Sequence, residues 1–72
     1  MGEAEERRGE VNLTQAEWAV LAKVAEGKPT KVIARELCKA PVTVRDQVNS
    51  ILEKLGVENR TQAAAFYLRA MI

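Results

Sequence analysis

Residues 30–55 read TKVIARELCKAPVTVRDQVNSILEKL, and this stretch decides the fold. It predicts a short helix through Leu37, a tight break over residues 38–40 and a longer helix that starts again at Pro41. One side of the longer helix is an apolar stripe formed by Val44, Val48, Ile51 and Leu55. The opposite side carries Val42, Arg45, Asp46, Asn49 and Glu53. One face of this helix is therefore expected to pack, and the other is free to contact a partner.

A capping box predicts a first helix ahead of this pair. Thr14 and Glu17 have the spacing at which each side chain bonds the backbone N–H of the other. The helix is expected over residues 15–26, and Gly27 suits the left-handed turn that ends it. Trp18 lies off the main apolar stripe and is expected to be a partly buried packing residue rather than a partner contact.

The starts of the two central helices are less well specified. Thr30 is the expected N-cap of the second helix, over residues 31–37, because its hydroxyl can accept a free backbone N–H. Ala40 is a poor N-cap for the third helix, over residues 41–55. Pro41 partly offsets this, since its fixed φ suits the first helical position.

A fourth helix is predicted over residues 60–71, with Asn59 as its N-cap. It has an apolar stripe for the core and a second one formed by Ala64, Ala65, Leu68 and Ile72. The second stripe predicts a homodimer interface, and the alternative is a row of exposed small residues at a frayed C-terminus. Without any strand signal, the expected fold is all-α, a compact four-helix bundle that contains a helix-turn-helix.

Length and composition favour one small domain. Residues 13–72 are expected to form it, and residues 1–12 read as a flexible charged leader or linker. The chain is 47% apolar and 29% charged, and it contains no apolar run near the roughly 20 residues of a membrane span. No signal peptide is recognisable, so a cytoplasmic location away from membranes is expected.

Catalytic and metal chemistry are disfavoured by what the chain contains. The single cysteine, Cys38, excludes an internal disulfide. Because the chain has no histidine, a zinc site or a His-based catalytic triad is not expected. Cys38 is expected to be a small turn residue, with a redox sensor as the alternative. No paired carboxylates, activated nucleophile or phosphate-cradling glycine loop is apparent, so neither an enzyme nor a cofactor is expected.

The charge is unevenly distributed although the net charge is only +1. Residues 1–12 hold four glutamates and two arginines, whereas residues 13–72 hold nine basic and six acidic side chains. Residues 28–54 contain six basic and three acidic side chains. The two-helix unit thus has a modest phosphate-binding character.

These residues resemble the LuxR/NarL/GerE-type DNA-binding domain found at the C-terminus of many bacterial response regulators and quorum-sensing regulators. The matching motifs are Leu13-Thr14-x-x-Glu17, Val20-Leu21, Ala25-x-Gly27, Lys31-x-Ile33-Ala34-x-x-Leu37, Thr43-Val44-Arg45, Val48-x-x-Ile51-x-x-Lys54-Leu55-Gly56-Val57 and Asn59-Arg60-x-x-Ala63. The resemblance implies a third helix in the major groove and a fourth helix at the dimer contact. Three departures are Lys39-Ala40, where the family usually has Ile-Ser, Ala16, where it usually has Arg before the first-helix Glu, and Gln47, where it usually has His.

The resemblance also implies which side chains contact DNA. The slots that face the bases hold Val42, Arg45, Asp46 and Asn49, and the slots that face phosphates hold Lys31, Thr43, Gln47 and Lys54. Arg45 suits a guanine edge, Asn49 an adenine and Asp46 a cytosine amino group. For Asp46 the alternative is a brace on Arg45 or a partner for Asn49. Glu17 and Arg60 occupy matched positions and are expected to pair across the first and fourth helices.

Two functions of different class remain. The leading one is a sequence-specific transcription regulator, or its output domain, that binds double-stranded DNA as a homodimer and has RNA polymerase as a further candidate partner. The alternative is a helix-turn-helix module that binds a protein, which the low net charge, Asp46 and the weak cap at Ala40 favour. A membrane-bound amphipathic helix is excluded because the basic residues are spread over several helices.

Overall fold

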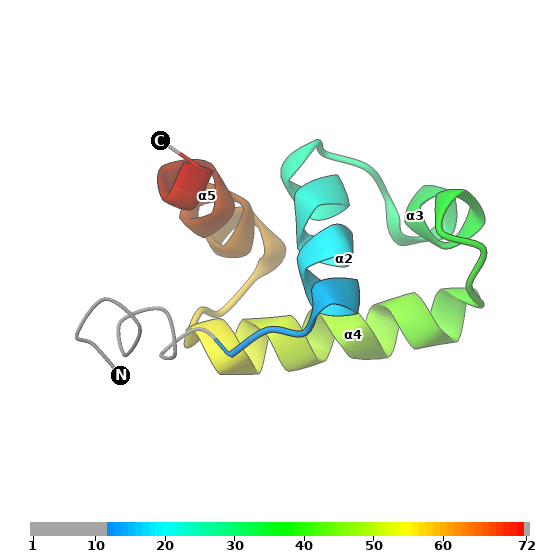
Figure 1. Ribbon diagram of the computed structural model, residues 1–72, viewed down its shortest axis with the longest axis horizontal. Coiled ribbons are helices and arrows are strands. Elements are labelled where there is room, and N and C mark those ends of the chain that lie inside the picture. Colours follow the sequence, from blue (N-terminus) through cyan, green and yellow to red (C-terminus); the bar gives the residue numbers. More distant parts are fainter. Residues whose placement is uncertain (1–11, 72) are drawn as a thin grey trace.

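Four helices make up the part of the chain that the computed structural model describes, residues 12–71 (Figure 1). They are α2 (Gln15–Ala25), α3 (Thr30–Glu36), α4 (Pro41–Leu55) and α5 (Arg60–Met71). No strand occurs within residues 12–71, so the predicted all-α fold is confirmed and its helix bounds agree within one residue. Of the predicted features, the leader up to residue 11 and Ile72 of the dimer stripe lie outside the described residues.

The predicted capping box starts α2. The Thr14 hydroxyl accepts the Glu17 backbone N–H at 3.1 Å, and a Glu17 carboxylate oxygen accepts the Thr14 N–H at 3.0 Å. At the other end Gly27 has φ +84°, a left-handed conformation that costs glycine little. Both helix ends therefore follow from local sequence.

The predicted N-cap of α3 is wrong. Pro29 occupies the cap position in an extended conformation, and its carbonyl accepts the N–H of Ile33 at 3.0 Å. Thr30 is already helical, and its hydroxyl accepts a hydrogen bond from Arg60 at 3.1 Å instead of capping the helix. A partner from a distant helix thus replaces the local one.

The turn between α3 and α4 is built on a left-handed residue other than glycine. Cys38 has φ +58°, and the Lys39 N–H donates to the Ala34 carbonyl at 2.8 Å, as in a Schellman motif. Ala40 then leads into α4 without any side-chain cap, as its residue type predicts. Cys38 is therefore a turn residue, and its thiol is exposed.

Replacing Cys38 with glycine is expected to stabilise the fold by about 1 kcal/mol, because glycine has no Cβ to crowd the left-handed conformation. Urea or thermal unfolding measures the effect. Cys38→Ala is the matched control, since it keeps the Cβ and should stay within about 0.5 kcal/mol of the parent. A glycine variant less stable than the alanine variant contradicts this explanation of the turn.

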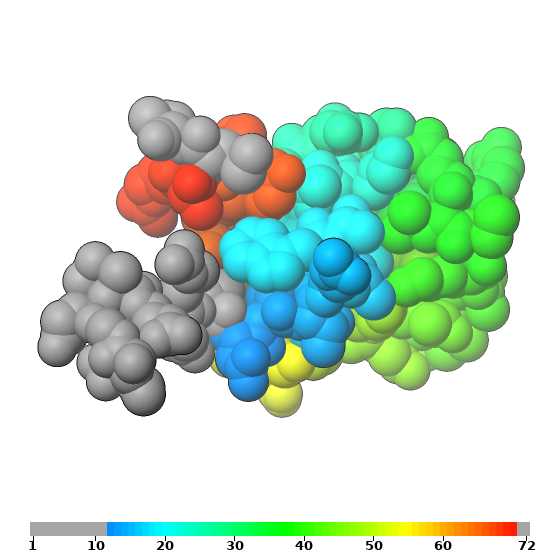
Figure 2. All heavy atoms as spheres, viewed as in Figure 1, coloured from blue at the N-terminus to red at the C-terminus, as the bar shows by residue number. Residues whose placement is uncertain are grey.

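The core lies where α2 meets the other three helices. Its fully buried side chains are Leu21, Ile33, Ile51, Val20 and Val44, which come from α2, α3 and α4. Ala63 of α5 is also buried, and the half-buried Trp18 packs on this core with its ring centroid 6.3 Å from that of Tyr67. Figure 2 shows α2 filling the space between α5 and the α3 end of the molecule. The expected packing role of Trp18 is confirmed.

Candidate nucleic-acid interface

One face of α4 is open to solvent along its length. Figure 1 shows α2, α3 and α5 on the same side of α4, which agrees with the buried stripe of Val44, Val48 and Ile51. The predicted base-contacting side chains all lie on the open side and are exposed: Val42, Arg45, Asp46 and Asn49. Val42, at 51% relative exposure, and Leu68 are the large apolar side chains that are exposed in the described part of the chain. The structure therefore brings this predicted set together on one surface.

Arg45 and Asp46 are close to each other but only weakly paired. The Arg45 Nε and the Asp46 Oδ1 are 4.0 Å apart, and the two side chains are 67% and 72% exposed. Exposed pairs at this separation contribute little to stability. None of the side-chain hydrogen bonds within residues 12–71 joins Asp46 to Asn49. The guanidinium of Arg45 is thus not committed to a strong intramolecular bond.

The predicted phosphate-contacting residues fall on two elements. Lys31 is exposed on α3, and the other three lie along one edge of α4 at Thr43, Gln47 and Lys54. Thr43 is exposed, whereas Gln47 is half-buried and its Oε1 accepts a hydrogen bond from the Lys39 Nζ at 3.1 Å. Lys54 also has a partner, because its Nζ lies 2.8 Å from a carboxylate oxygen of Glu17.

Glu17 joins α2 to this edge of α4. Its side chain is buried, with 7% relative exposure, and it accepts hydrogen bonds from the Ser50 hydroxyl at 3.0 Å and the Lys54 ammonium at 2.8 Å. Burial raises the pKa of this carboxyl, but the bonds from Lys54, Thr14 and Ser50 outweigh burial and hold the pKa below its usual value. The carboxylate thus stays charged and fixes α4 on α2.

The predicted pair of Glu17 with Arg60 is therefore wrong. Both Glu17 oxygens are occupied by the Thr14 cap and by α4. Arg60 instead donates to the Lys28 carbonyl at 2.8 Å and to the Thr30 hydroxyl at 3.1 Å, which ties the start of α5 to the α2–α3 connection and to the first residue of α3. Sequence pattern identified both residues as structural, but it did not specify their partners.

Arg60→Ala is expected to lower the free energy of unfolding by about 1 to 2 kcal/mol, because two hydrogen bonds from a charged donor are lost. Thermal unfolding measures the loss. Arg60→Lys is the control: it keeps the charge but cannot hold both acceptors in one planar fork, so it should recover only part of the stability. An alanine variant that melts like the parent while losing DNA sequence preference contradicts this structural role.

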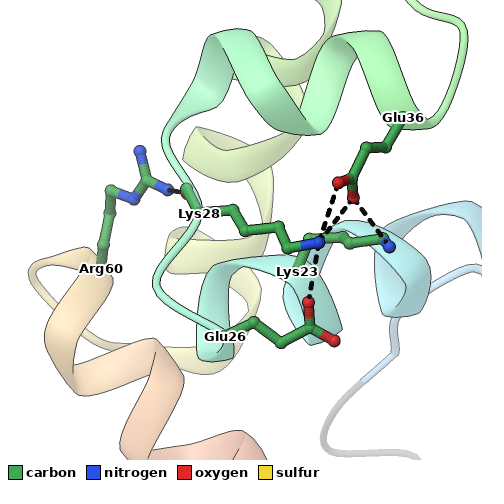
Figure 3. A network of polar contacts seen from close by, with 5 residues as sticks. All are labelled: Lys23, Glu26, Lys28, Glu36 and Arg60. Atoms are coloured by element: carbon green, nitrogen blue, oxygen red, sulfur yellow. Dashed lines mark hydrogen bonds and ion pairs between the residues drawn. The ribbon is translucent and has the colours of Figure 1, made fainter.

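A cluster of ion pairs connects α2 and α3 on the side away from the open face of α4 (Figure 3). Glu36 of α3 contacts the Nζ of Lys28 at 2.8 Å and the Nζ of Lys23 at 2.9 Å, and Lys28 also reaches Glu26 at 3.3 Å. Lys28, then Lys23, lower the pKa of Glu36 to about 2. The two pairs made by Glu36 join residues that are eight and thirteen positions apart, so no short-range sequence pattern pointed to them.

The Glu36 cluster makes stability sensitive to acid. Because the folded state favours the charged carboxylate, its contribution is complete above the ordinary pKa of 4.5 and is lost as pH falls towards about 2. The thermal midpoint, measured from about pH 7 down to about pH 2, should therefore fall below about pH 4.5, and Glu17 acts in the same direction because its pKa is also lowered. Glu36→Gln should make this decline in the thermal midpoint less steep, whereas Glu53→Gln, at an exposed position of α4, should leave the decline unchanged. An identical decline in both variants contradicts the assignment.

The predicted dimer stripe is partly open. Ala64 is half-buried, Ala65 is exposed and Leu68 is 54% exposed. Ala64 also lines a shallow depression with Val24, Ala25, Gly27, Lys28, Pro29, Arg60 and Thr61. The stripe therefore leaves apolar surface on α5 that the described chain does not cover.

Neither a metal site nor a membrane span is found in the described residues. Across residues 12–71 no group of three or more cysteine, aspartate or glutamate side chains is placed to hold a metal ion. No helix in the same range has the length and apolarity to cross a membrane.

Comparison with known proteins places this arrangement in a family. The family described as bacterial regulatory proteins, luxR family, matches residues 11–67. The spore germination protein GerE of Bacillus subtilis is 40% identical over 57 residues, which cover 79% of this chain and 77% of GerE. The transcriptional regulatory protein DesR of Bacillus subtilis is 53% identical over 51 residues, which cover 71% of this chain and 26% of DesR.

A third relative is longer than the chain as well. The DNA-binding transcriptional activator DevR/DosR of Mycobacterium tuberculosis is 42% identical over 65 residues, which are 90% of this chain and 30% of DevR/DosR. The chain thus spans less than a third of DesR and DevR/DosR. The family match includes α2, α3 and α4 entirely and most of α5. The chain belongs to the luxR family of bacterial regulatory proteins, as its motifs indicate.

Proposed function

We propose that this chain binds double-stranded DNA sequence-specifically in transcription regulation, with α4 in the major groove. The observation that carries the proposal is the open face of α4, where the four predicted base-contacting side chains are exposed together. An α-helix fits the major groove, and its outward side chains then reach base edges. Membership of the luxR family and the description of DevR/DosR as a DNA-binding transcriptional activator support the same function.

The chemistry of the four side chains suits base recognition. Arg45 can donate two parallel hydrogen bonds to a guanine edge, and Asn49 can both donate to and accept from an adenine. Asp46 accepts from a cytosine amino group, and the exposed Val42 suits a thymine methyl group. Each good bidentate pair gives about 1 to 3 kcal/mol of discrimination against a wrong base.

Phosphate contacts would hold α4 in register. Lys31, Thr43 and Gln47 present donors from α3 and from one edge of α4. Lys54 retains 36% side-chain exposure beside Glu17, so its ammonium can bind a phosphate while the carboxylate holds it in place. Such contacts fix position but carry no sequence information.

The proposed active form is a homodimer in the cytoplasm. The exposed α5 surface at Ala64, Ala65 and Leu68 would pack against the same surface of a second copy, which places two recognition helices on two half-sites. RNA polymerase is the further partner that regulation of transcription implies. Leu68→Glu should prevent dimer formation in sedimentation experiments with DNA, while Gln62→Glu, on the polar edge of α5, should not.

Salt dependence tests DNA binding against the alternative of a protein-binding module. With about four phosphates neutralised per chain, log affinity should fall against log salt with a slope of about −3 to −4, roughly a hundredfold between about 50 and 200 mM. Lys31→Gln should reduce that slope by about 1, and Arg69→Gln on α5 should leave it unchanged. Absence of duplex binding at low salt would favour the protein-binding module. The exposed carboxylate of Asp46 and the pairing of Lys28 and Lys54 with glutamates are the observations that support this alternative.

A further inference from the structure

We infer that Lys39 and Gln47 form one phosphate clamp, in which Lys39 both contacts a DNA backbone phosphate and orients the Gln47 amide towards it. This inference rests on the proposed DNA binding and adds to it a residue, Lys39, that the family resemblance does not assign. The observation behind it is the hydrogen bond from the Lys39 Nζ to the Gln47 Oε1 at 3.1 Å. Both side chains are half-buried, so the contact is partly shielded from water.

The donor chemistry fixes how Gln47 must lie. A lysine ammonium has three N–H donors and no acceptor, so Gln47 has to present its carbonyl oxygen to Lys39. The Gln47 NH2 group then points away from Lys39 and keeps both of its donors. Lys39 keeps two of its own. The remaining hydrogen-bond donors of the pair and its positive charge suit an acceptor-only anion such as a phosphate diester.

The backbone around Lys39 holds the clamp in place. The Lys39 N–H donates to the Ala34 carbonyl at 2.8 Å, directly after the left-handed Cys38. From this fixed point the lysine side chain reaches Gln47, eight residues later in the second turn of α4. Ordering of both side chains before DNA binds reduces the entropy lost on binding.

Neighbouring groups on the same edge favour an anion as well. Thr43 lies one turn before Gln47 and is exposed, and α4 starts at Ala40 and Pro41 without a side-chain cap over its positive end. The nearest acid along α4, Asp46, is instead placed beside Arg45 on the open face. The clamp thus lies at the border between that face and the α3–α4 turn.

A double-mutant cycle on the whole chain tests the clamp. Lys39→Met removes the ammonium but keeps the apolar stem, and Gln47→Leu removes the amide at similar size. We expect Lys39→Met to reduce the salt slope by about 1 and to weaken specific and random duplexes by the same factor. We expect Gln47→Leu to weaken binding several-fold in the parent and much less in the Lys39→Met background.

Controls separate the clamp from general effects of charge and from the proposed function. Arg69→Gln removes the same charge from α5 and should leave the slope unchanged. If Lys39→Met melts below the assay temperature, Lys39→Gln provides the same comparison at this half-exposed site. The clamp is overturned if a Lys39 variant leaves the salt slope unchanged, as Arg69→Gln does, while the parent chain still binds DNA. It is also overturned if the losses of affinity in the two clamp variants are additive. A parent chain that binds no duplex overturns the clamp together with the proposed function.

Discussion

Replacing Arg45 with alanine is expected to lower affinity for the preferred duplex by about 1 to 3 kcal/mol, roughly ten- to a hundredfold, and to affect random DNA far less. The reason is geometric. Arg45 lies on the open face of α4 with a side chain that is 67% exposed, and its neighbour Asp46 is 4.0 Å away. Its planar fork is therefore available for two parallel bonds to one guanine edge.

Competition binding against single-base variants of the preferred duplex measures this effect. The alanine variant should lose discrimination at one base position and keep it elsewhere. Arg45→Lys should also lose most of it, because a lysine cannot make the planar bidentate contact. Arg35→Ala is the matched control, because Arg35 is exposed on α3, and any loss of affinity in that variant should be uniform across duplexes. A uniform loss for Arg45→Ala would instead identify Arg45 as a phosphate contact.

Replacing Glu17 with alanine is expected to lower the free energy of unfolding by about 3 kcal/mol. One side chain serves three partners, since it accepts from the Thr14 backbone, the Ser50 hydroxyl and the Lys54 ammonium. Loss of a cap costs about 1 kcal/mol, and hydrogen bonds to a charged group contribute about 1.5 to 3 kcal/mol. For a domain of this size the melting temperature should fall by more than about 10 °C.

Two companion variants make the Glu17 result interpretable. Glu17→Gln keeps an oxygen for the capping box but loses the charge, so its stability should lie between parent and alanine variant. Glu53→Ala removes an exposed glutamate next to Lys54 and should change stability by no more than about 0.5 kcal/mol. A Glu17→Ala variant as stable as Glu53→Ala contradicts the role of Glu17 in fixing α4 on α2.

The sequence was sufficient for features that depend on neighbours along the chain. The Thr14 and Glu17 capping box, the left-handed Gly27 and the apolar stripe of α4 all follow from local spacing, and the helix bounds agree with them. The open face of α4 was predictable for the same reason, because the buried stripe determines which side remains. Fold and recognition surface were thus accessible together.

Features that depend on contacts between distant elements were not accessible in the same way. Thr30 accepts from Arg60 rather than capping α3, and Glu17 bonds Ser50 and Lys54 rather than Arg60. In each case several polar partners were compatible with the sequence, and only packing of the helices selects among them. The contact of Lys39 with Gln47 was not predictable either, because it depends on the path of the α3–α4 turn.

Selection of bound sequences from a random duplex library tests the central claim most directly. The chain should retain duplexes that share a motif of two half-sites about one helical turn apart, with one position that loses information in Arg45→Ala. That result would establish base reading by α4 and binding as a dimer in one experiment. Failure to enrich any motif at low salt, from a chain whose thermal unfolding shows it to be folded, would contradict sequence-specific DNA binding.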